Sequence, residues 1–406
     1  MEALEQHVQS LEAIRKAVDR VFRVTRPLIG GSDQDYLVKY YGQLLLDSET
    51  AYDQLAAALR PYEVTPFFRI EGAQQVILVR AGVVNPRPSN PRLNLLLFIA
   101  TLFSVFYAGA MYVYDGPLPE NAFQQLLAPL GTIWTGWPFA VSILAILLAH
   151  EFGHYLAGRY HKTALTLPYF IPFPINVLGT LGAVILWKEP PKNKKILLDI
   201  GIAGPLAGLV VAIPILLYGL WLSPVKPLPT MENNVAGFAL EGNSLLYLAA
   251  KYVVHSQLLP APVSYGDVNP VVYWARYIIT SQPIPFGGMD VSMNPVAWAG
   301  WAGLLVTALN LIPAGQLDGG HVINVLLGNR ARAFLPVILL VLGALGFFWS
   351  GWWLWVFLLL LLGRVYAEPL DMITPLDNKR KALAILGMIV FVLVFIPVPL
   401  LPVFAQ

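Results

Sequence analysis

The run LAILLAHEFGHYLAGRY, residues 144–160, carries two histidines and a glutamate at the end of a long apolar stretch. On a helix, His150 and His154 lie four residues apart and face the same way, so that two imidazoles can bind one cation. Glu151 lies beside them and is not needed as a ligand, so it can accept a proton from a metal-bound water. Such side chains are costly in an apolar spanning helix and are functional by default. The alternative is a chance match or a hydrogen-bonded pair of helix histidines.

The composition of the whole chain is that of a membrane protein. Of 406 residues, 57% are hydrophobic and 12% charged, against about a quarter charged in soluble domains. Several apolar runs lie after residue 93, and their lengths are close to the roughly 20 residues needed to cross a bilayer. The net charge of +2 argues against a nucleic-acid partner, and the absence of cysteine excludes disulfides and thiolate metal sites. The polar N-terminus predicts no cleavable signal peptide. We therefore expect a mainly α, polytopic transmembrane helix bundle in a lipid bilayer.

Residues 1–88 predict a small soluble α+β domain, followed by a linker at 89–92 within a proline-rich stretch. A first amphipathic helix is indicated by apolar residues at helical spacing: Val8, Leu11, Ile14, Val18 and Val21. A second helix is expected to begin near Asp47 and Ser48, which are good caps, and the stretches 65–70 and 75–80 predict a hairpin. This domain carries no recognisable chemistry, which favours a regulatory or partner-docking role.

Residues 93–406 are expected to form the membrane domain, with about seven spans and a re-entrant hairpin near 163–190. The expected spans are 93–114, 134–158, 196–221, 295–316, 333–349, 351–363 and 382–403, of which the fifth and sixth could form one helical hairpin. The stretches 244–258 and 270–280, inside an external loop at 222–294, are short and interfacial. Of the 26 Lys and Arg residues, only Lys226, Lys251 and Arg276 lie in that loop. The positive-inside rule then predicts a cytosolic N-terminus.

A catalytic zinc site needs a third protein ligand besides water. Residues 155–187 contain no Asp or Glu, so this ligand should come from another membrane segment. Asp318 is the candidate, because it follows the long apolar run of the fourth span and lies at a depth similar to that of the histidines. The alternative is that Asp318 caps a helix and that Gly319 and Gly320 merely end the span.

At this point the sequence resembles the site-2 protease family of intramembrane zinc metalloproteases, in which HExxH is paired with a distant N-x-x-P-x-x-x-L-D-G-G. The second motif is matched by Asn310, Pro313, Leu317, Asp318, Gly319 and Gly320. The resemblance covers roughly residues 93–330. It implies that His150, His154 and Asp318 bind Zn²⁺, that Glu151 is the general base, and that Asn310 acts on the substrate backbone or the oxyanion. The alternative for Asn310 is a hydrogen bond to a neighbouring helix.

Two further stretches are similar to the family branch that has a soluble N-terminal extension. Gly179, Thr180, Leu181 and Gly182 begin the first stretch, where the resemblance implies a hairpin that binds an unwound substrate by β-addition. The alternative is a structural plug. The second stretch contains Gly201, Gly204, Pro205 and Gly208, and its small residues favour close helix packing.

The remaining histidines are interpreted as structural. His321 is expected near the site without being a ligand, His161 and His255 at interfaces, and His7 in the soluble domain. Many members of this family carry a PDZ domain, but the 222–294 loop lacks its alternating strands. How this protein is regulated and how it selects substrates therefore cannot be inferred from relatives that carry a PDZ domain.

The sequence thus predicts an intramembrane zinc metalloendopeptidase in a prokaryotic inner membrane. It would act on single-span or polytopic membrane proteins, while its oligomeric state is left open. Two alternatives are a membrane zinc transporter and an inactive scaffold relative. A transporter would need polar residues leading outward from the site, and an inactive relative would have a broken motif.

Overall fold

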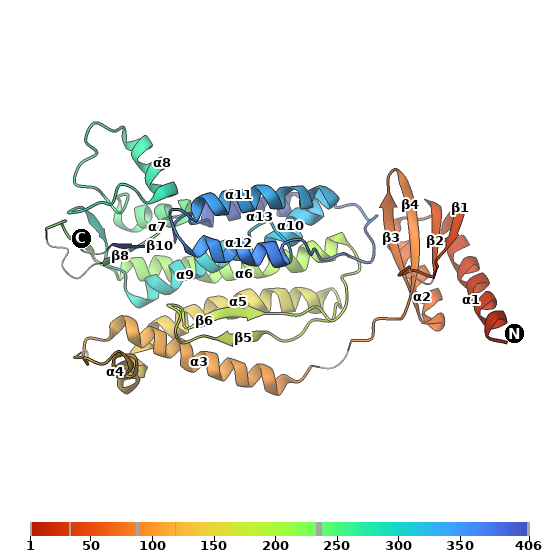
Figure 1. Cartoon of the computed structure of the whole chain (residues 1–406), viewed down its shortest axis with the longest axis horizontal. Coiled ribbons are helices and arrows are strands. Elements are labelled where there is room, and N and C mark those ends of the chain that lie inside the picture. Colours follow the sequence, from red (N-terminus) through yellow and green to blue (C-terminus); the bar gives the residue numbers. More distant parts are fainter. Residues whose placement is uncertain (1, 32–33, 87–88, 118, 233–237, 404–406) are drawn as a thin grey trace.

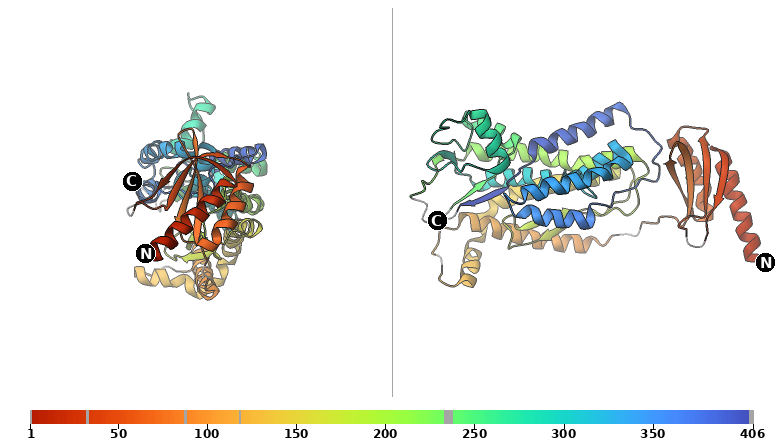
Figure 2. Two further views of the ribbon diagram at one scale, coloured as in Figure 1. Left: turned by 90° about the vertical axis from the view of Figure 1, so that its right-hand side faces the viewer. Right: turned by 45° about the horizontal axis from the view of Figure 1, so that its top comes forward.

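The computed structural model describes residues 2–31, 34–86, 89–117, 119–232 and 238–403. The fold class predicted from the sequence is confirmed, because helices dominate and the largest sheet lies near the N-terminus. The N-terminal sheet stands beyond one end of a helix bundle, and the C-terminal strand lies at the opposite end (Figures 1 and 2).

The N-terminal module, residues 2–81, is a four-stranded antiparallel sheet with strand order β1-β2-β4-β3 and two helices. Asp47 caps α2 by accepting from the Thr50 amide at 3.0 Å, as the sequence predicts. The predicted hairpin is confirmed as β3 and β4, whereas β1 and β2 were not foreseen. The elements are α1 (Glu2–Asp19), β1 (Phe22–Ile29), β2 (Val38–Leu44), α2 (Ser48–Leu59), η1 (Arg60–Tyr62), β3 (Val64–Glu71) and β4 (Gln74–Ala81).

The helix bundle contains long and short helices. Among the described residues, three helical stretches are long and apolar enough to cross a bilayer, namely Pro91–Val113, Ala122–Tyr160 and Lys194–Trp221. The bundle helices are α3 (Pro91–Val113), α4 (Ala122–Leu127), η2 (Ala128–Gly136), α5 (Trp137–Tyr160), α6 (Lys194–Trp221), α9 (Pro295–Asn310), α10 (Asp318–Leu327), η3 (Gly328–Phe334), α11 (Leu335–Leu345), α12 (Gly351–Leu362) and α13 (Asn378–Val394). Of the seven spans predicted from the sequence, three therefore correspond to helices long enough to cross a bilayer, and four correspond to shorter helices.

The fifth and sixth predicted spans are α11 and α12, with 11 and 12 residues. At 1.5 Å per residue each covers about 16–18 Å, well short of the ~30 Å hydrocarbon core. The two helices pack against each other, with Trp352 buried between them and α13. This is the helical hairpin that the sequence left open as an alternative.

Helix α6 is the centre of the bundle, because it packs along both α5 and α9. Close approach depends on small residues at the crossings. A Cβ on Gly300 of α9 would lie 2.6 Å from the Leu216 Cα of α6, and one on Gly153 of α5 would lie 2.6 Å from the Ala203 carbonyl oxygen. Helix α6 stays continuous through Pro205 and Pro214. The tight α5–α6–α9 layer fixes the helices that carry the candidate site.

The end of the bundle remote from the N-terminal module is closed by short strands and helices. The prediction of a last span over 382–403 is wrong beyond Val394. Pro397 and Pro399 cannot continue a helix, and the chain goes on as a strand. The closing elements are β7 (Val225–Pro227), paired with β9 (Met289–Val291), β8 (Phe238–Glu241), paired with β10 (Leu400–Val403), and the helices α7 (Leu245–His255) and α8 (Pro270–Thr280).

Between α5 and α6 the chain forms a short antiparallel hairpin of β5 (Tyr169–Pro172) and β6 (Thr180–Val184). The hairpin lies beside α3, and Ser104 of α3 donates a hydrogen bond to the Gly179 carbonyl. Gly179 has φ +71°, and a Cβ there would lie 2.6 Å from the Ser104 carbonyl oxygen. Glycine is therefore required where the hairpin turns against α3.

Candidate metal centre

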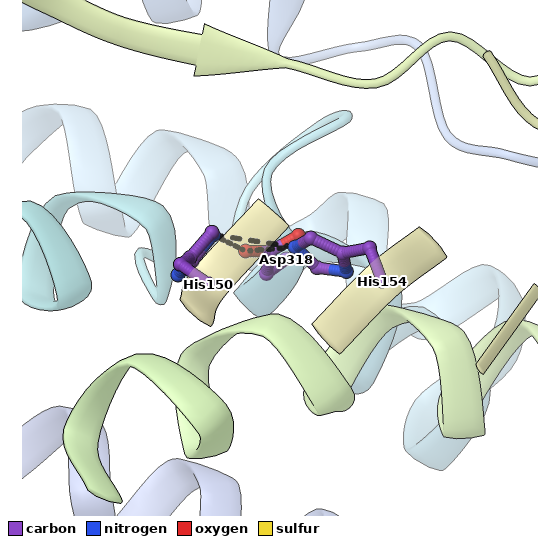
Figure 3. A group of neighbouring side chains, drawn as sticks. All are labelled: His150, His154 and Asp318. Atoms are coloured by element: carbon purple, nitrogen blue, oxygen red, sulfur yellow. Dashed lines mark hydrogen bonds and ion pairs between the residues drawn. The ribbon is translucent and has the colours of Figure 1, made fainter. Parts of the chain in front are cut away.

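Helix α5 presents three polar side chains to the middle of the bundle. His150 and Glu151 are each 4% exposed, although they lie on a helix whose other buried residues are mostly apolar. His150 and His154 are one turn apart, and their Nε2 atoms lie 3.2 Å from each other. Figure 3 shows both rings turned toward a side chain that comes from a different helix.

That third side chain is Asp318. Its Oδ2 lies 3.3 Å from His150 Nε2 and 3.4 Å from His154 Nε2. Three ligand atoms held about 2.0–2.1 Å from a tetrahedral zinc ion lie about 3.3–3.4 Å from one another. The triangle of two nitrogens and one oxygen therefore has the size that a zinc ion requires. The sequence predicted this convergence, and the structure brings the three residues together.

The position of Asp318 depends on a break between α9 and α10. Helix α9 ends at Asn310, and Asp318 is the first residue of α10. A Cβ on Gly319 would lie 1.9 Å from the Leu311 carbonyl oxygen, and one on Gly320 would lie 2.3 Å from the Gly315 carbonyl oxygen. The two glycines thus begin a helix folded tightly against the preceding turn. The alternative in which they end a span is wrong.

The orientation of His154 is set by α6. Its Nδ1 donates to the Ile200 carbonyl oxygen at 2.7 Å, which leaves Nε2 without a proton and able to bind a metal. A Cβ on Gly204 would lie 2.1 Å from His154 Nε2, and one on Gly208 would lie 3.3 Å from His150 Cβ. The sequence favoured helix packing for these glycines. Their closeness to the imidazoles was not foreseen, although the four-residue spacing of both pairs is a signal for it.

Asn310 also reaches the site. Its Nδ2 lies 3.3 Å from His150 Nε2, so the last residue of α9 is adjacent to the ligand triangle. Glu151, Asn310 and the three candidate ligands all line one cavity of about 690 Å³. A general base, an amide donor and a metal-sized triangle therefore share one space.

The same cavity extends toward the end of the bundle that faces the N-terminal module. Its wall there consists of residues 183–191, which are the end of β6 and the chain that follows it, and of residues 367–368. Gly179, Thr180, Leu181 and Gly182 do not line it; Gly179 lies against Ser104 of α3 at the turn of the hairpin, and Leu181 is exposed. The chain just downstream of the predicted substrate-binding residues lies closer to the candidate ligands.

The remaining histidines occupy different surroundings. His321 is buried, lines the cavity and packs edge-on against Trp187, but it is outside the ligand triangle. His161 pairs with Asp199 at 2.9 Å where α5 ends, and His255 lies in the last turn of α7. His7 lies in α1, within residues 2–10, whose side chains are not described.

Comparison with known proteins identifies similar sequences. Residues 138–345 match the model of peptidase family M50. The chain is 32% identical over 344 residues to "Probable zinc metalloprotease EGY1, chloroplastic" of Oryza sativa subsp. japonica, covering 79% of this chain and 53% of that protein. It is 27% identical over 308 residues to "Probable zinc metalloprotease EGY2, chloroplastic" of Arabidopsis thaliana, covering 74% and 49%. The chain thus spans about half the length of these curated relatives. No solved structure matches it.

Proposed function

The chain belongs to peptidase family M50, and on that premise we propose that it is an intramembrane zinc metalloprotease. It would hydrolyse a peptide bond in or near a transmembrane segment of single-span or polytopic membrane proteins. The observation that carries this proposal is the ligand triangle of His150, His154 and Asp318. It lies inside a membrane helix bundle, with Glu151 in the same cavity.

His150, His154 and Asp318 would hold the zinc ion, since two imidazoles and a carboxylate form a usual catalytic zinc set. When bound, zinc supplies Lewis acidity, which polarises the scissile carbonyl and lowers the pKa of water. Glu151 accepts the proton of the attacking water and delivers it to the leaving amine. The Asn310 amide donates to the carbonyl oxygen on which negative charge develops. The Ile200 carbonyl keeps His154 in the tautomer that binds metal.

A substrate helix must unwind before its peptide bond can be attacked, because helical hydrogen bonds shield it. The chain from Gly179 through Thr180, Leu181 and Gly182 begins the edge along which an unwound segment would add. In support, β6 pairs only with β5 within the described part of the chain. The end of β6 and the chain that follows it, residues 183–191, line the cavity. A substrate strand that pairs with this edge would therefore extend into the cavity that contains Glu151.

The membrane arrangement is proposed from charge. The end of the bundle nearest the N-terminal module carries most of the Lys and Arg residues, so this end would face the cytosol of a prokaryotic cell. The domain limits at 1–88, 89–92 and 93–406 are proposed with it. A zinc transporter would need a polar route outward along α5, whereas Phe139, Ile143 and Ile146 there are apolar and buried.

Glu151→Gln tests the proposal, because it keeps the shape of the side chain and removes the base. Cleavage of a single-span substrate should fall by about 10²–10⁴-fold, the usual contribution of general acid–base catalysis, while zinc stays at one ion per chain. Glu232→Gln, on the exposed surface, is the matched control and should cleave normally. Unchanged cleavage by the Glu151→Gln protein would refute the mechanism. Absence of zinc from the unaltered protein would refute the site.

A further inference from the structure

The segment between α12 and α13 joins the N-terminal module to the cavity. In Figure 1 this blue stretch leaves the helix bundle and lies against β3. Its middle adds to the edge of the N-terminal sheet. The Phe68 amide donates to the Leu370 carbonyl at 2.9 Å, and the Met372 amide donates to the Phe68 carbonyl at 3.0 Å.

The same segment also pairs with the chain that precedes α6. The Leu370 amide donates to the Pro191 carbonyl at 2.9 Å, and the Asp371 amide donates to the Lys192 carbonyl at 2.7 Å. The N-terminal sheet therefore continues through residues 370–372 to residues 191–193. Pro191 lines the cavity, as does Glu368, three residues before Asp371. Residues 188–191 and 367–368 are called the mouth below.

Asp371 is the centre of this junction. It has no exposed surface, and its carboxylate accepts from the Ser48 hydroxyl at 2.8 Å and from the backbone amides of Ile373 and Thr374 at 2.7 and 3.1 Å. Ser48 belongs to the N-terminal module. Without the module, Asp371 would lose this partner and the Met372 amide would lose its acceptor. Asp371 keeps the Ile373 and Thr374 amides and the Thr374 hydroxyl as donors, but the two lost partners must be replaced by water, which loosens residues 370–372 beside the mouth.

Apolar packing couples the junction to both parts of the molecule. Leu370 and Ile373 pack on the core of the N-terminal module, whereas Ala367 and Leu376 pack on the core formed by α6, α10 and α13. Asn324 of α10 donates to the Ala367 carbonyl at 3.1 Å. Since α10 begins with Asp318, the junction also touches the helix that supplies a candidate ligand.

The rest of the contact is electrostatic and half exposed. Lys195 pairs with Glu49 at 2.6 Å, Lys192 with Asp53 at 2.6 Å, and Arg69 with Glu368 at 3.7 Å. Small polar interfaces of this kind between parts of one chain usually permit relative motion. The contact is thus specific in its hydrogen bonds, while its partly exposed ion pairs add little to its stability.

We propose that the N-terminal module is a regulatory module that controls access to the cavity by docking on and leaving the junction. While it is docked, residues 188–191 and 367–368 are held in place and restrict entry to the cavity. When it leaves, Glu368 loses its ion pair with Arg69, residues 370–372 lose Phe68 and Ser48, and the loosened segments open the way to the cavity. The regulatory meaning rests on the proposed protease function, whereas the control of access does not.

The test uses the natural absence of cysteine. Ala183→Cys places one thiol in the cavity wall, and Glu12→Cys places one on the exposed face of α1, far from the junction. The rate of reaction with a bulky maleimide reports access in the full-length protein. Glu49→Lys sets a lysine beside Lys192 and Lys195, and Lys195→Glu sets a glutamate against Glu49. Each change should raise labelling of the cavity thiol by about fivefold or more, while the thiol at position 12 reacts unchanged.

The double variant Glu49→Lys with Lys195→Glu restores an opposite pair but not the acceptor of the Asn193 amide, so labelling should fall back about halfway to the starting rate. Asp371→Asn removes one negative charge instead of reversing a charge. It should also raise labelling of the cavity thiol, by less than the single charge reversals do. Equal labelling in the single reversals and the parent, or no recovery in the double variant, would overturn the proposal. Labelling needs no catalysis, so this result is separate from any failure of the Glu151→Gln experiment. A parallel cleavage assay then shows whether access limits turnover.

Discussion

Position 204 shows how strictly the site constrains single residues. The space that a side chain would occupy there is filled by the ring of His154, whose Nε2 would lie 2.1 Å from a Cβ. The ring cannot move away, because its Nδ1 is tied to the Ile200 carbonyl on the same helix. A methyl group at this position must therefore displace a ligand atom.

Gly204→Ala is expected to lower zinc affinity by about 10–100-fold, the usual effect of disturbing the surroundings of a ligand. Zinc titration against a competing chelator measures this directly. Gly208→Ala is the matched control, since its Cβ would lie 3.3 Å from His150 Cβ, and a shift of a few tenths of an ångström relieves the contact. Normal zinc affinity in the Gly204→Ala protein would show that the ring orientation described here is not the one that binds metal.

The role of Asn310 can be determined by measuring zinc affinity and kcat separately. If its amide donates to the developing oxyanion, Asn310→Ala should lower kcat by about 10²–10³-fold and leave zinc content unchanged. If it only holds His150, 3.3 Å away, the same change should lower zinc affinity instead. Metal analysis together with kcat and KM on one preparation distinguishes the two roles. Unchanged kcat would exclude the catalytic role.

Among the elements, the break between α9 and α10 creates the site. A continuous helix through residues 295–327 would carry Asp318 more than two turns beyond Asn310, so the two could not line the same cavity. The turn at 311–317, with Gly315 at φ +57°, redirects the chain so that α10 packs on α6 and α13. The helix N-terminus also favours the negative charge of Asp318.

The short elements at the far end of the bundle enclose a buried ion triad. Lys251 of α7 has no exposed surface and lies 3.4 Å from both Glu241 of β8 and Asp290 of β9. Lys251→Met would leave two buried carboxylates without a cation, at a cost of about 3–5 kcal/mol. Thermal unfolding in detergent measures the loss, and Lys226→Met, at an exposed position, should change little. A similarly stable Lys251→Met protein would contradict this account.

The same triad predicts a dependence of stability on pH. Burial, together with the nearby Asp290, raises the pKa of Glu241 from 4.5 to about 7. Because the folded protein then holds a proton that the unfolded chain releases, this stabilisation is complete below about pH 4.5 and is lost as pH rises through about 7. The melting temperature should therefore fall between about pH 4.5 and 7, and Glu241→Gln should remove that slope. If the melting temperature of the Glu241→Gln protein still depends on pH in this range, other titrating groups cause the dependence.

At the scale of the whole molecule, docking of the N-terminal module should respond to salt and acid. The hydrogen bond from Lys195 lowers the pKa of Glu49 below its ordinary value of 4.5. Its contribution to docking is thus present above pH 4.5 and is lost as pH falls through the lowered pKa. Raising salt from about 0.1 to 1 M shortens the Debye length from about 10 to 3 Å, which weakens the exposed pairs.

Spin labels at Glu12→Cys and Tyr160→Cys, both exposed, report the distance between the module and the bundle. The distance distribution should be narrow at neutral pH and low salt, and should broaden in 1 M salt or near pH 4. A pair within the module, Glu12→Cys with Gln74→Cys, should keep its distribution, which excludes unfolding. A distribution that stays narrow under all conditions would show that the docking is permanent.

The local parts of this protein could be read from its sequence. Helical spacing puts His150, Glu151 and His154 on adjacent positions whatever the rest of the chain does, and long apolar runs must form helices in a bilayer. Asp318 was predicted as the third ligand from its place after a long apolar run and its depth in the membrane, and the resemblance of its motif implied the same. Most helix limits follow from the same local rules, and the last span failed where prolines and strand pairing overrode hydropathy.

Contacts between distant segments were decided only by the tertiary structure. That Gly204 lies against a ligand ring, that residues 183–191 line the cavity, and that Asp371 anchors the N-terminal module all depend on how helices and strands pack. Periodicity records which face of an element is apolar, but not which partner covers that face. Which partner covers a face is decided by close packing, and here glycines and buried hydrogen bonds set the distances between the elements.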